Sequence, residues 1–410
     1  MMKLLLTLLL LATVESNTRR TLKGKKKSKA LKGKKGVCVV GCTPYVNPDA
    51  YDEGILKWQA LVEDMASQCD VMIHTGDTKA GAAVCNKNLM TGPIHTMVEA
   101  AQKHGTMVLY APGDNELNDC HRDGSRVPPR PADFYKAADA RQFLIDDLGV
   151  SRDTDLTGAY AVDSHMKSGI IPGTSDSYSC DFDKYAEFDN FAVATLEVMG
   201  SQWYLADQSG SSRYPNQDSV DPLADRLGMY LNAKDCALEW ITMSANKASK
   251  AGLSAVFFNM QAHFWTHDRY GSIMSYLPSD GIGEYYNTTN LARMTEELTG
   301  EAIEHPFQPL YDHLTATAFA HPDIMFYVVH ADSHVWVDQR MNSYTSNIGD
   351  DIITHHNLMI LQVEGDSRAL TMFAKLTVDP DDFNPVTAHQ VWSKSAYDVI
   401  PVGHAFYKYS

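Results

Sequence analysis

Three short apolar segments, separated by stretches with helical periodicity, constrain the fold of this chain more than any other feature. Residues 37–41, 70–74 and 106–110 have the composition of buried strands. Apolar residues at helical spacing predict helices over residues 52–68 and 93–103, between these strands. Strands that alternate with helices in this way are typical of parallel strands in an α/β fold.

The same alternation of strands and helices is predicted in the second half of the chain, which also contains two longer irregular segments. Residues 150–190 and 266–320 are predicted to be loop-rich insertions, the second with a helix near residues 291–298. The 44% hydrophobic content is enough for a substantial core. The other predicted elements are a helix at residues 235–250 and strands at 191–198, 254–260, 324–329, 357–363 and 369–377.

Polar residues that could bind a ligand follow five of the predicted strands. They are Cys42, Asp77, Asp114, His263, and the pair Asp332 and His334. In open α/β sheets, ligands bind beyond the carboxyl ends of the strands. A single Asp in such a place usually caps the next helix. A set of Asp and His side chains from distant parts of the chain is suited to a divalent metal.

The first 35 residues differ in composition from the rest. Residues 1–16 combine Lys3 with an apolar run that is shorter than the roughly 20 residues needed to span a membrane. We interpret them as a secretory signal peptide that is cleaved, with an uncleaved anchor as the alternative. No later segment reaches the about 18 consecutive apolar residues of a membrane span, so no transmembrane helix is expected.

Charge is divided unevenly along the chain. Residues 1–35 contain 11 of the 35 Lys and Arg residues and one of the 51 acidic residues. Residues 36–410 are therefore strongly acidic, which argues against nucleic acid as a partner, because its phosphates are bound by Lys and Arg. Residues 17–35 are predicted to be a flexible basic arm, which is either a solvated linker or a contact for an anionic matrix or membrane surface.

The cysteines and one glycosylation sequon are consistent with secretion. In a secreted chain, the odd number of cysteines, seven, leaves at least one outside any intrachain disulfide. Residues Asn287, Thr288 and Thr289 form an N-glycosylation sequon. Together these features predict a glycoprotein of the secretory pathway or the extracellular space.

Four motifs resemble those of the calcineurin-like metallophosphoesterases. They are HTGDTK at residues 74–79, PGDNE at 112–116, QAH at 261–263 and ADSH at 331–334. The likeness is greater to a variant branch, often bacterial, with GDTPY, then HxGDxKxG, then PGDNExxDCHR. Here the first of these is GCTPY at residues 41–45, and the last extends to Arg122. The motifs together span residues 41–334.

The resemblance implies a fold and a chemistry for residues 36–410. The fold is an αββα sandwich, in which two mixed sheets are flanked by helices. Two divalent transition metals, drawn from zinc, iron and manganese, lie at the sheet edge. A hydroxide held by the metals attacks the phosphorus of a phosphomonoester or phosphodiester. By this resemblance Asp77 lies between the metals, Cys42 and His334 belong to the first, and Asp114, His263 and Asp332 belong to the second.

The sequence departs from the family pattern at three places. Cys42 stands where an Asp is usual, although a thiolate also binds zinc or iron. Asn115 stands at the position of the general acid and cannot donate a proton at neutral pH. Residues 331–334 replace the usual GHxH. A secreted pseudoenzyme that binds a partner or a matrix is therefore the alternative to a hydrolase.

Lys79, Asn115, Glu116 and Arg122 are the candidate catalytic residues. Lys79 would contact a phosphate oxygen, or else pair with Glu116 or Asp114 as structural support. Arg122 suits bidentate binding of a phosphate, and would equally hold an acidic loop in place. Cys85 and Cys120 match family positions, and the resemblance implies a disulfide between them, with two separate thiols as the alternative.

Overall fold

The computed structural model describes most of the chain between residues 36 and 398. The expected signal peptide, the basic arm and the sequon at Asn287 lie outside the described residues. The described residues are 36–45, 51–81, 83–120, 131–165, 168–170, 177–200, 203–204, 223–262, 266–267, 273–274, 296, 300, 306–331, 337–339, 344–348, 351–355, 357–363, 371–379 and 386–398.

The first sheet contains the three strands predicted near the start of the chain. Its strands in the described residues are β1 (Val37–Val40), β2 (Val71–His74), β3 (Met107–Tyr110), β17 (Met372–Val378) and β18 (Val386–Trp392). They lie in the order β18, β17, β1, β2, β3. β1, β2 and β3 are parallel, whereas β17 pairs antiparallel with β1 and with β18. Helices α2 (Tyr51–Gln68) and α3 (Lys87–His104) connect the parallel strands.

The second sheet collects strands from the rest of the chain. Its described strands are β4 (Asp163–Ser164), β7 (Lys184–Glu187), β8 (Phe191–Thr195), β9 (Ala255–Asn259), β12 (Met325–His330), β13 (Val337–Gln339) and β16 (Leu358–Gln362). Their order is β13, β16, β12, β9, β8, β7, β4. The central four, β16, β12, β9 and β8, are parallel, and the strands at both edges are antiparallel.

The two sheets pack face to face through one apolar layer. In β1, Val37 and Val39 belong to this layer, whereas Cys38 and Val40 face the other way. This alternation follows from the period of two along a strand. Phe257 and Val329 come to the same layer from the second sheet.

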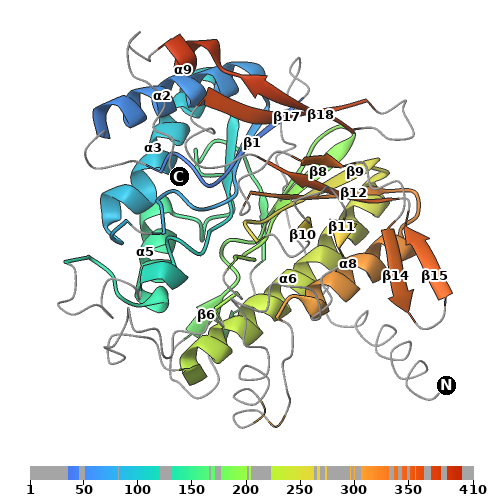
Figure 1. Ribbon diagram of the computed structural model, residues 1–410. Coiled ribbons are helices and arrows are strands. Elements are labelled where there is room, and N and C mark those ends of the chain that lie inside the picture. The colour runs from blue at the N-terminus through green and yellow to red at the C-terminus, as the bar shows by residue number, and fades with distance from the viewer. Residues whose placement is uncertain are drawn as a thin grey trace, which may run out of the picture. The chain divides into compact units, whose positions relative to one another are not determined.

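Helices cover the outer faces of both sheets. α2 and α3 pack on the first sheet through a cluster that includes Trp58 and Met97. α5 (Ala137–Leu148), α6 (Leu223–Ala251) and α8 (Gln308–Ala320) belong to a second cluster, which includes Phe258 of β9. Figure 1 shows α2 and α3 on one side of the sheets and α6 and α8 on the other. The predicted αββα sandwich is confirmed.

Several predicted elements have different bounds in the structure. α3 begins at Lys87 rather than near Pro93, because the Asn86 side chain accepts a hydrogen bond from the Leu89 N–H and caps the helix. α6 begins twelve residues before the predicted start at residue 235. α8 lies inside residues 266–320, which were expected to be a loop-rich insertion. The helix expected near residues 291–298 lies largely outside the described residues.

The described part of the stretch 150–190, which was expected to be loop-rich, contains four short strands. Two of them, β4 and β7, extend the second sheet. The other two, β5 and β6, pair with each other. The elements not yet given bounds are η3 (Asn118–Cys120), β5 (Ser168–Ile170), β6 (Ser177–Ser179), β10 (Thr266–His267), β11 (Ile273–Met274), β14 (Tyr344–Ile348), β15 (Asp351–His355) and α9 (Lys394–Asp398).

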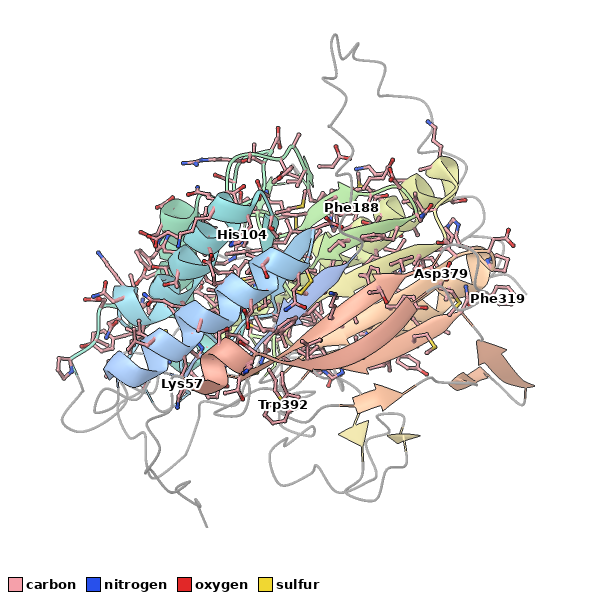
Figure 2. All side chains as sticks on the ribbon, turned by 90° about the horizontal axis from the view of Figure 1, so that it is seen from above. Lys57, His104, Phe188, Phe319, Asp379 and Trp392 are labelled. Carbon is pink, nitrogen blue, oxygen red and sulfur yellow. A yellow bond between two sulfur atoms is a disulfide. The ribbon has the colours of Figure 1, made fainter. Side chains whose placement is uncertain are left out.

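Large apolar side chains are exposed at a few isolated places. Phe319 and Trp392 are exposed, and Figure 2 shows them on different parts of the surface rather than in one patch. Isolated apolar residues of this kind are normal on a protein surface. Within the described residues, we find no helix with the length and apolar character needed to cross a bilayer.

Candidate metal centre

Four polar residues come together where strands of the two sheets end. Cys42 follows β1 and Asp77 follows β2, while Asp114 comes after β3 and Gln261 after β9. Because β1, β2 and β3 are parallel, their carboxyl ends lie at the same edge of the sheet. The structure thus brings together three of the six predicted metal ligands, Cys42, Asp77 and Asp114, and adds Gln261.

The carboxylate of Asp77 is the centre of this cluster and is only 2% exposed. Its Oδ1 accepts a hydrogen bond from the Asn115 N–H, at 3.1 Å. Its Oδ2 lies 3.4 Å from Cys42 Sγ and 3.3 Å from the Tyr45 hydroxyl. Gln261 Nε2 donates to the same Oδ2 at 3.1 Å. Asp77 is therefore held by groups from three separate loops, those after β1, β3 and β9.

Asp114 is joined to Asp77 through the Gln261 amide. Gln261 Nε2 lies 3.1 Å from Asp114 Oδ1, the same distance as from Asp77 Oδ2. Gln261 Oε1 accepts a hydrogen bond from the Gly200 N–H. This contact directs the amide nitrogen, and not its oxygen, towards the two carboxylates.

Close approach of two backbones keeps the loops after β2 and β3 together. Gly76 has a φ of 79°, and a Cβ there would collide with the backbone of Gly113. A Cβ on Gly113 would in turn collide with Asp77. Both glycines are therefore required for the loops that carry Asp77 and Asp114 to lie this close together.

Backbone strain is concentrated in this region. Cys42, Tyr45 and Asp77 all have positive φ, at 51°, 42° and 60°. Such values are uncommon for residues with a side chain and persist where the surroundings enforce them. Three of them at one sheet edge are consistent with side chains held in place for a chemical task.

Glu116 is fully buried and connects the loop after β2 with the loop after β3. Its Oε1 accepts hydrogen bonds from the Asp77 N–H at 2.9 Å, the Gly113 N–H at 3.0 Å and the Tyr110 hydroxyl at 2.6 Å. Burial raises the pKa of Glu116, although these hydrogen bonds and the charge of Lys79 oppose the shift. Its contacts are those of a residue that positions Asp77.

Lys79 is also buried, with 1% exposure. Its ammonium group donates to the carbonyl oxygens of Ala83 at 3.0 Å and Ala80 at 3.4 Å, both in its own loop. Asn115 donates from Nδ2 to the Tyr45 hydroxyl at 3.1 Å. Burial, followed by the charges of Asp77 and Cys42, raises the pKa of Tyr45 well above its ordinary value.

The predicted disulfide between Cys85 and Cys120 is confirmed. It links the loop after β2 to the η3 turn after β3, so that it clamps the two loops that carry Asp77 and Asp114. Two further disulfides, whose partners the sequence left open, join Cys38 to Cys69 and Cys180 to Cys236. Cys42 is the cysteine outside the three disulfides and is buried.

The chemistry of the donor set fits a divalent cation. Among the described residues of this cluster, the buried charged groups are three carboxylates and one ammonium group, from Asp77, Asp114, Glu116 and Lys79. Burial of a carboxylate costs several kcal/mol unless a cation, a proton or hydrogen bonds compensate it. A cation bound by the carboxylates would supply part of that compensation.

The distance between Cys42 and Asp77 fits one shared ion. In a tetrahedral zinc site with bonds of about 2.3 Å to sulfur and about 2.0 Å to oxygen, the two ligand atoms lie about 3.5 Å apart. The observed separation of Cys42 Sγ and Asp77 Oδ2 is 3.4 Å. Cys42 and Asp77 can therefore bind the same ion, once the thiol has lost its proton.

Four of the predicted site residues lie outside the described residues: Arg122, His263, Asp332 and His334. Two of their neighbours are described. Ala262 is buried next to Gln261, and Ala331 packs so closely on Gly41 that a Cβ on Gly41 would collide with it. The end of β12 therefore lies beside the end of β1.

Sequence reasoning missed Tyr45 and Gln261 as members of the cluster. Both residues lie within the motifs quoted above, GCTPY and QAH. Neither phenol nor amide is a typical metal ligand, so residue type gave no reason to select them. Their position next to a predicted ligand in a motif was the available signal.

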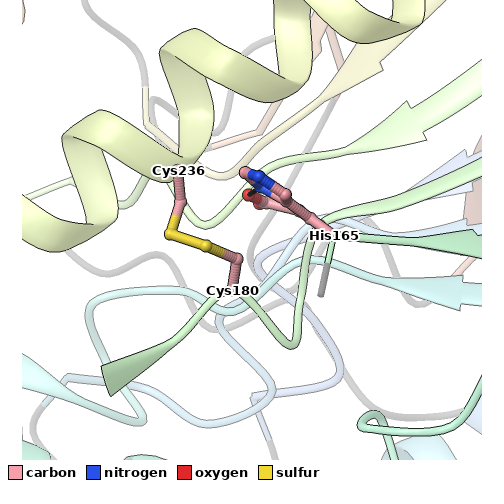
Figure 3. Close-up of side chains that lie close together, drawn as sticks. His165, Cys180 and Cys236 are labelled. Atoms are coloured by element: carbon pink, nitrogen blue, oxygen red, sulfur yellow. Dashed lines mark hydrogen bonds and ion pairs between the residues drawn. A yellow bond between two sulfur atoms is a disulfide. The ribbon is translucent and has the colours of Figure 1, made fainter. Parts of the chain in front are cut away.

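A second group of potential ligands lies in the second sheet, beside the carboxyl end of β8. His165, Cys180, Asp183 and Cys236 place one ligand atom each within 4.8 Å of one another. Cys180 and Cys236 are joined to each other, however, and Figure 3 shows their disulfide beside the ring of His165. Metals bind thiolates, so this group lacks two of its four ligands while the disulfide is intact.

Comparison with known proteins gives only distant likenesses. No protein-family model matches the sequence, and no curated protein matches it. The calcineurin-like phosphoesterase YfkN from Bacillus subtilis aligns with a TM-score of 0.34 and 7% identity, over 89% of this chain and 94% of that one. A 5'-nucleotidase from Candida albicans aligns with a TM-score of 0.36 and 11% identity, over 91% of this chain.

The chain spans 54% of the length of the nucleotidase. The TM-scores of both likenesses are low, and the chain's own sheets and helices define its fold. Two mixed sheets packed face to face, with helices on both outer surfaces, give it an αββα architecture.

Proposed function

We propose that this chain is a metal-dependent hydrolase of phosphoric esters, of the calcineurin-like type. The observation that carries the proposal is the convergence of Cys42, Asp77 and Asp114 on one buried cluster at the carboxyl ends of the strands. These are the residues that the motif resemblance selects as metal ligands. Divalent ions bound there would supply a nucleophile from water at neutral pH and polarise the phosphoryl group.

Each described residue has a distinct part in this proposal. Asp77 holds the centre of the site, with Cys42 on one side and Asp114 on the other. Glu116 and the Asn115 N–H fix the backbone and carboxylate of Asp77. The zinc, iron or manganese that the resemblance implies agrees with a mixed sulfur and oxygen donor set. His263, Asp332 and His334 would complete the coordination.

Substrate binding is assigned to a positively charged residue, Arg122. Arg122 would bind a phosphate oxygen pair through its guanidinium group. The contacts of Lys79 with its own loop favour structural support over direct phosphate binding. Because Asn115 cannot act as a general acid, the leaving group would take its proton from water. Phosphoesters with good leaving groups are therefore the expected substrates.

The compartment follows from the disulfides. Three disulfides among seven cysteines indicate an oxidising environment. We propose that the protein acts outside the cell or in the lumen of the secretory pathway.

Elemental analysis combined with a phosphoesterase assay tests the function. Protein grown with zinc, iron and manganese should contain one or two transition-metal ions per chain. It should hydrolyse at least one of a panel of activated phosphomonoesters and phosphodiesters. Activity should disappear with a chelator and return with the metal. Protein that remains metal-free after such growth would contradict the proposal.

The second candidate function is a secreted pseudoenzyme with the same fold. The position of Gln261 favours it, because a neutral amide already joins the two carboxylates. Metal binding without hydrolysis of any ester in the panel, or no metal binding at all, would support this alternative.

A further inference from the structure

Gln261 occupies an unusual position for a glutamine side chain. It is fully buried, and its amide nitrogen lies 3.1 Å from an oxygen of each of two acidic residues, Asp77 and Asp114. An amide NH₂ group has two N–H donors, so one can be directed at each carboxylate. The amide therefore offsets part of the repulsion between two buried negative charges without contributing a charge of its own.

The surroundings fix this orientation. The Gly200 N–H donates to Gln261 Oε1, and a flipped amide would turn its oxygen towards both carboxylates. The backbone N–H groups of Gln261 and Ala262 both donate to the Val198 carbonyl, at 3.1 and 3.0 Å. Val198 follows β8, so the loop that carries Gln261 is tied to the neighbouring strand.

An ion that joined the same two oxygens would compete with this amide. To bind the metal, Asp77 Oδ2 and Asp114 Oδ1 would each have to give up the hydrogen bond that they accept from Gln261 Nε2. The position between Cys42 and Asp77 is different, because binding there removes the thiol proton and with it the Cys42 contact to Oδ2. Oδ2 can then bind the ion in place of the thiol contact and keep its contacts with Gln261 and the Tyr45 hydroxyl.

We propose that Gln261 sets the number of divalent ions that the centre holds. With the amide in place, the position between Cys42 and Asp77 binds an ion, and a second ion between Asp77 and Asp114 binds weakly. Removal of the amide opens the second position. This inference rests on the proposed metal centre and names the residue of this chain that controls its occupancy.

Zinc titration of metal-free protein by isothermal calorimetry, with elemental analysis of dialysed samples, tests the inference. Wild-type protein should bind about one Zn²⁺ per chain tightly. Gln261→Ala should bind a second Zn²⁺ at least about tenfold more tightly than wild type does. Gln261→Leu, which keeps most of the side-chain volume, should give the same result if the alanine variant fails to fold.

Tyr45→Phe is the matched control. It removes a donor to Asp77 Oδ2 but leaves the link to Asp114 intact, so its stoichiometry should stay at one. Two tight ions in wild type, or equal stoichiometry in wild type and the Gln261 variants, would overturn the inference while leaving the hydrolase proposal standing.

Two further outcomes would overturn both proposals. If zinc binds to a Gln261 variant but not to wild type, the amide excludes both ions and not one, so the inference is overturned and the hydrolase proposal fails. If it binds to neither, both proposals fail.

Discussion

The described residues contain two groups of Cys, Asp and other potential ligands, and the groups differ in their backbone conformation and surroundings. At the sheet edge, Cys42 and Asp77 come from the ends of parallel strands and both have positive φ. In the second group, His165 and Asp183 lie beside a disulfide and the face of Trp240. The first brings buried carboxylates and a thiol together, whereas in the second the two sulfurs are already joined in a disulfide.

The contacts of Asp183 explain this difference. Its Oδ1 accepts from the Glu197 N–H at 3.2 Å, and its Oδ2 lies 3.4 Å from His165 Nδ1. The carboxylate therefore connects two segments of the second sheet. Ligand atoms at metal-binding distance are not sufficient evidence for a metal site, because their other partners decide whether an ion is needed.

Removal of the central carboxylate should have the largest effect. Asp77→Asn should lower hydrolysis of an activated phosphoester by at least about 1,000-fold, because loss of an outer partner of a metal ligand already costs about 10- to 100-fold. Elemental analysis should show lower metal content. The matched variant Asp183→Asn should leave metal content unchanged. Equal metal content in the two variants would erase the distinction between the groups.

Removal of the second group's disulfide should affect stability and not metal binding. Cys180 and Cys236 are 56 residues apart in sequence. Changing both to Ser should lower the free energy of unfolding by about 4 kcal/mol on the loop-entropy model. Chemical denaturation and elemental analysis of the same samples measure both quantities. A loss of metal in this variant would contradict the assignment of a purely structural role.

The pH dependence of stability should report on the sheet edge. Burial lowers the pKa of His74 from 6.5 to about 4, and its Nε2 lies 2.9 Å from the Thr43 carbonyl. As the pH falls below 6.5, the unfolded chain binds a proton that folded His74 does not, so stability is lost. The loss should level off below about pH 4, at about 3 kcal/mol.

His74→Gln tests this directly, because the amide can keep the bond to Thr43 but does not titrate. The variant should lose this part of the pH dependence between pH 4 and 6.5. Denaturant unfolding at several pH values measures it. An unchanged pH profile would show that the acid sensitivity arises elsewhere.

Exchange of the sulfur ligand should have the smallest effect. Cys42→Asp should shift the preference of the centre by about tenfold from zinc towards manganese, because a carboxylate is the harder ligand. Cys42→Ala should weaken binding of both ions. Competition titrations with the two metals measure the ratio. A ratio that stays the same in both variants would show that Cys42 only fills space at the end of β1.

The sequence was sufficient to predict the framework of the centre. β1, β2 and β3 are short and largely apolar, and each has a Gly within three residues of its end, so that both the strands and the positions of Asp77 and Asp114 could be inferred. The early start of α6 and the presence of α8 could not, because tertiary packing stabilises both helices. The roles of Gln261 and Glu116 depend on contacts across 184 and 39 residues of sequence, which no local pattern encodes.

The three disulfides follow one another along the chain without crossing: 38 with 69, 85 with 120, and 180 with 236. During vectorial synthesis, each pair is complete before the next pair emerges. Cys42 is the exception, because it appears between Cys38 and Cys69 and is a rival partner for either. A thiol held by Asp77 or by a metal would be withdrawn from that competition, so that assembly of the centre would also protect the fidelity of oxidative folding.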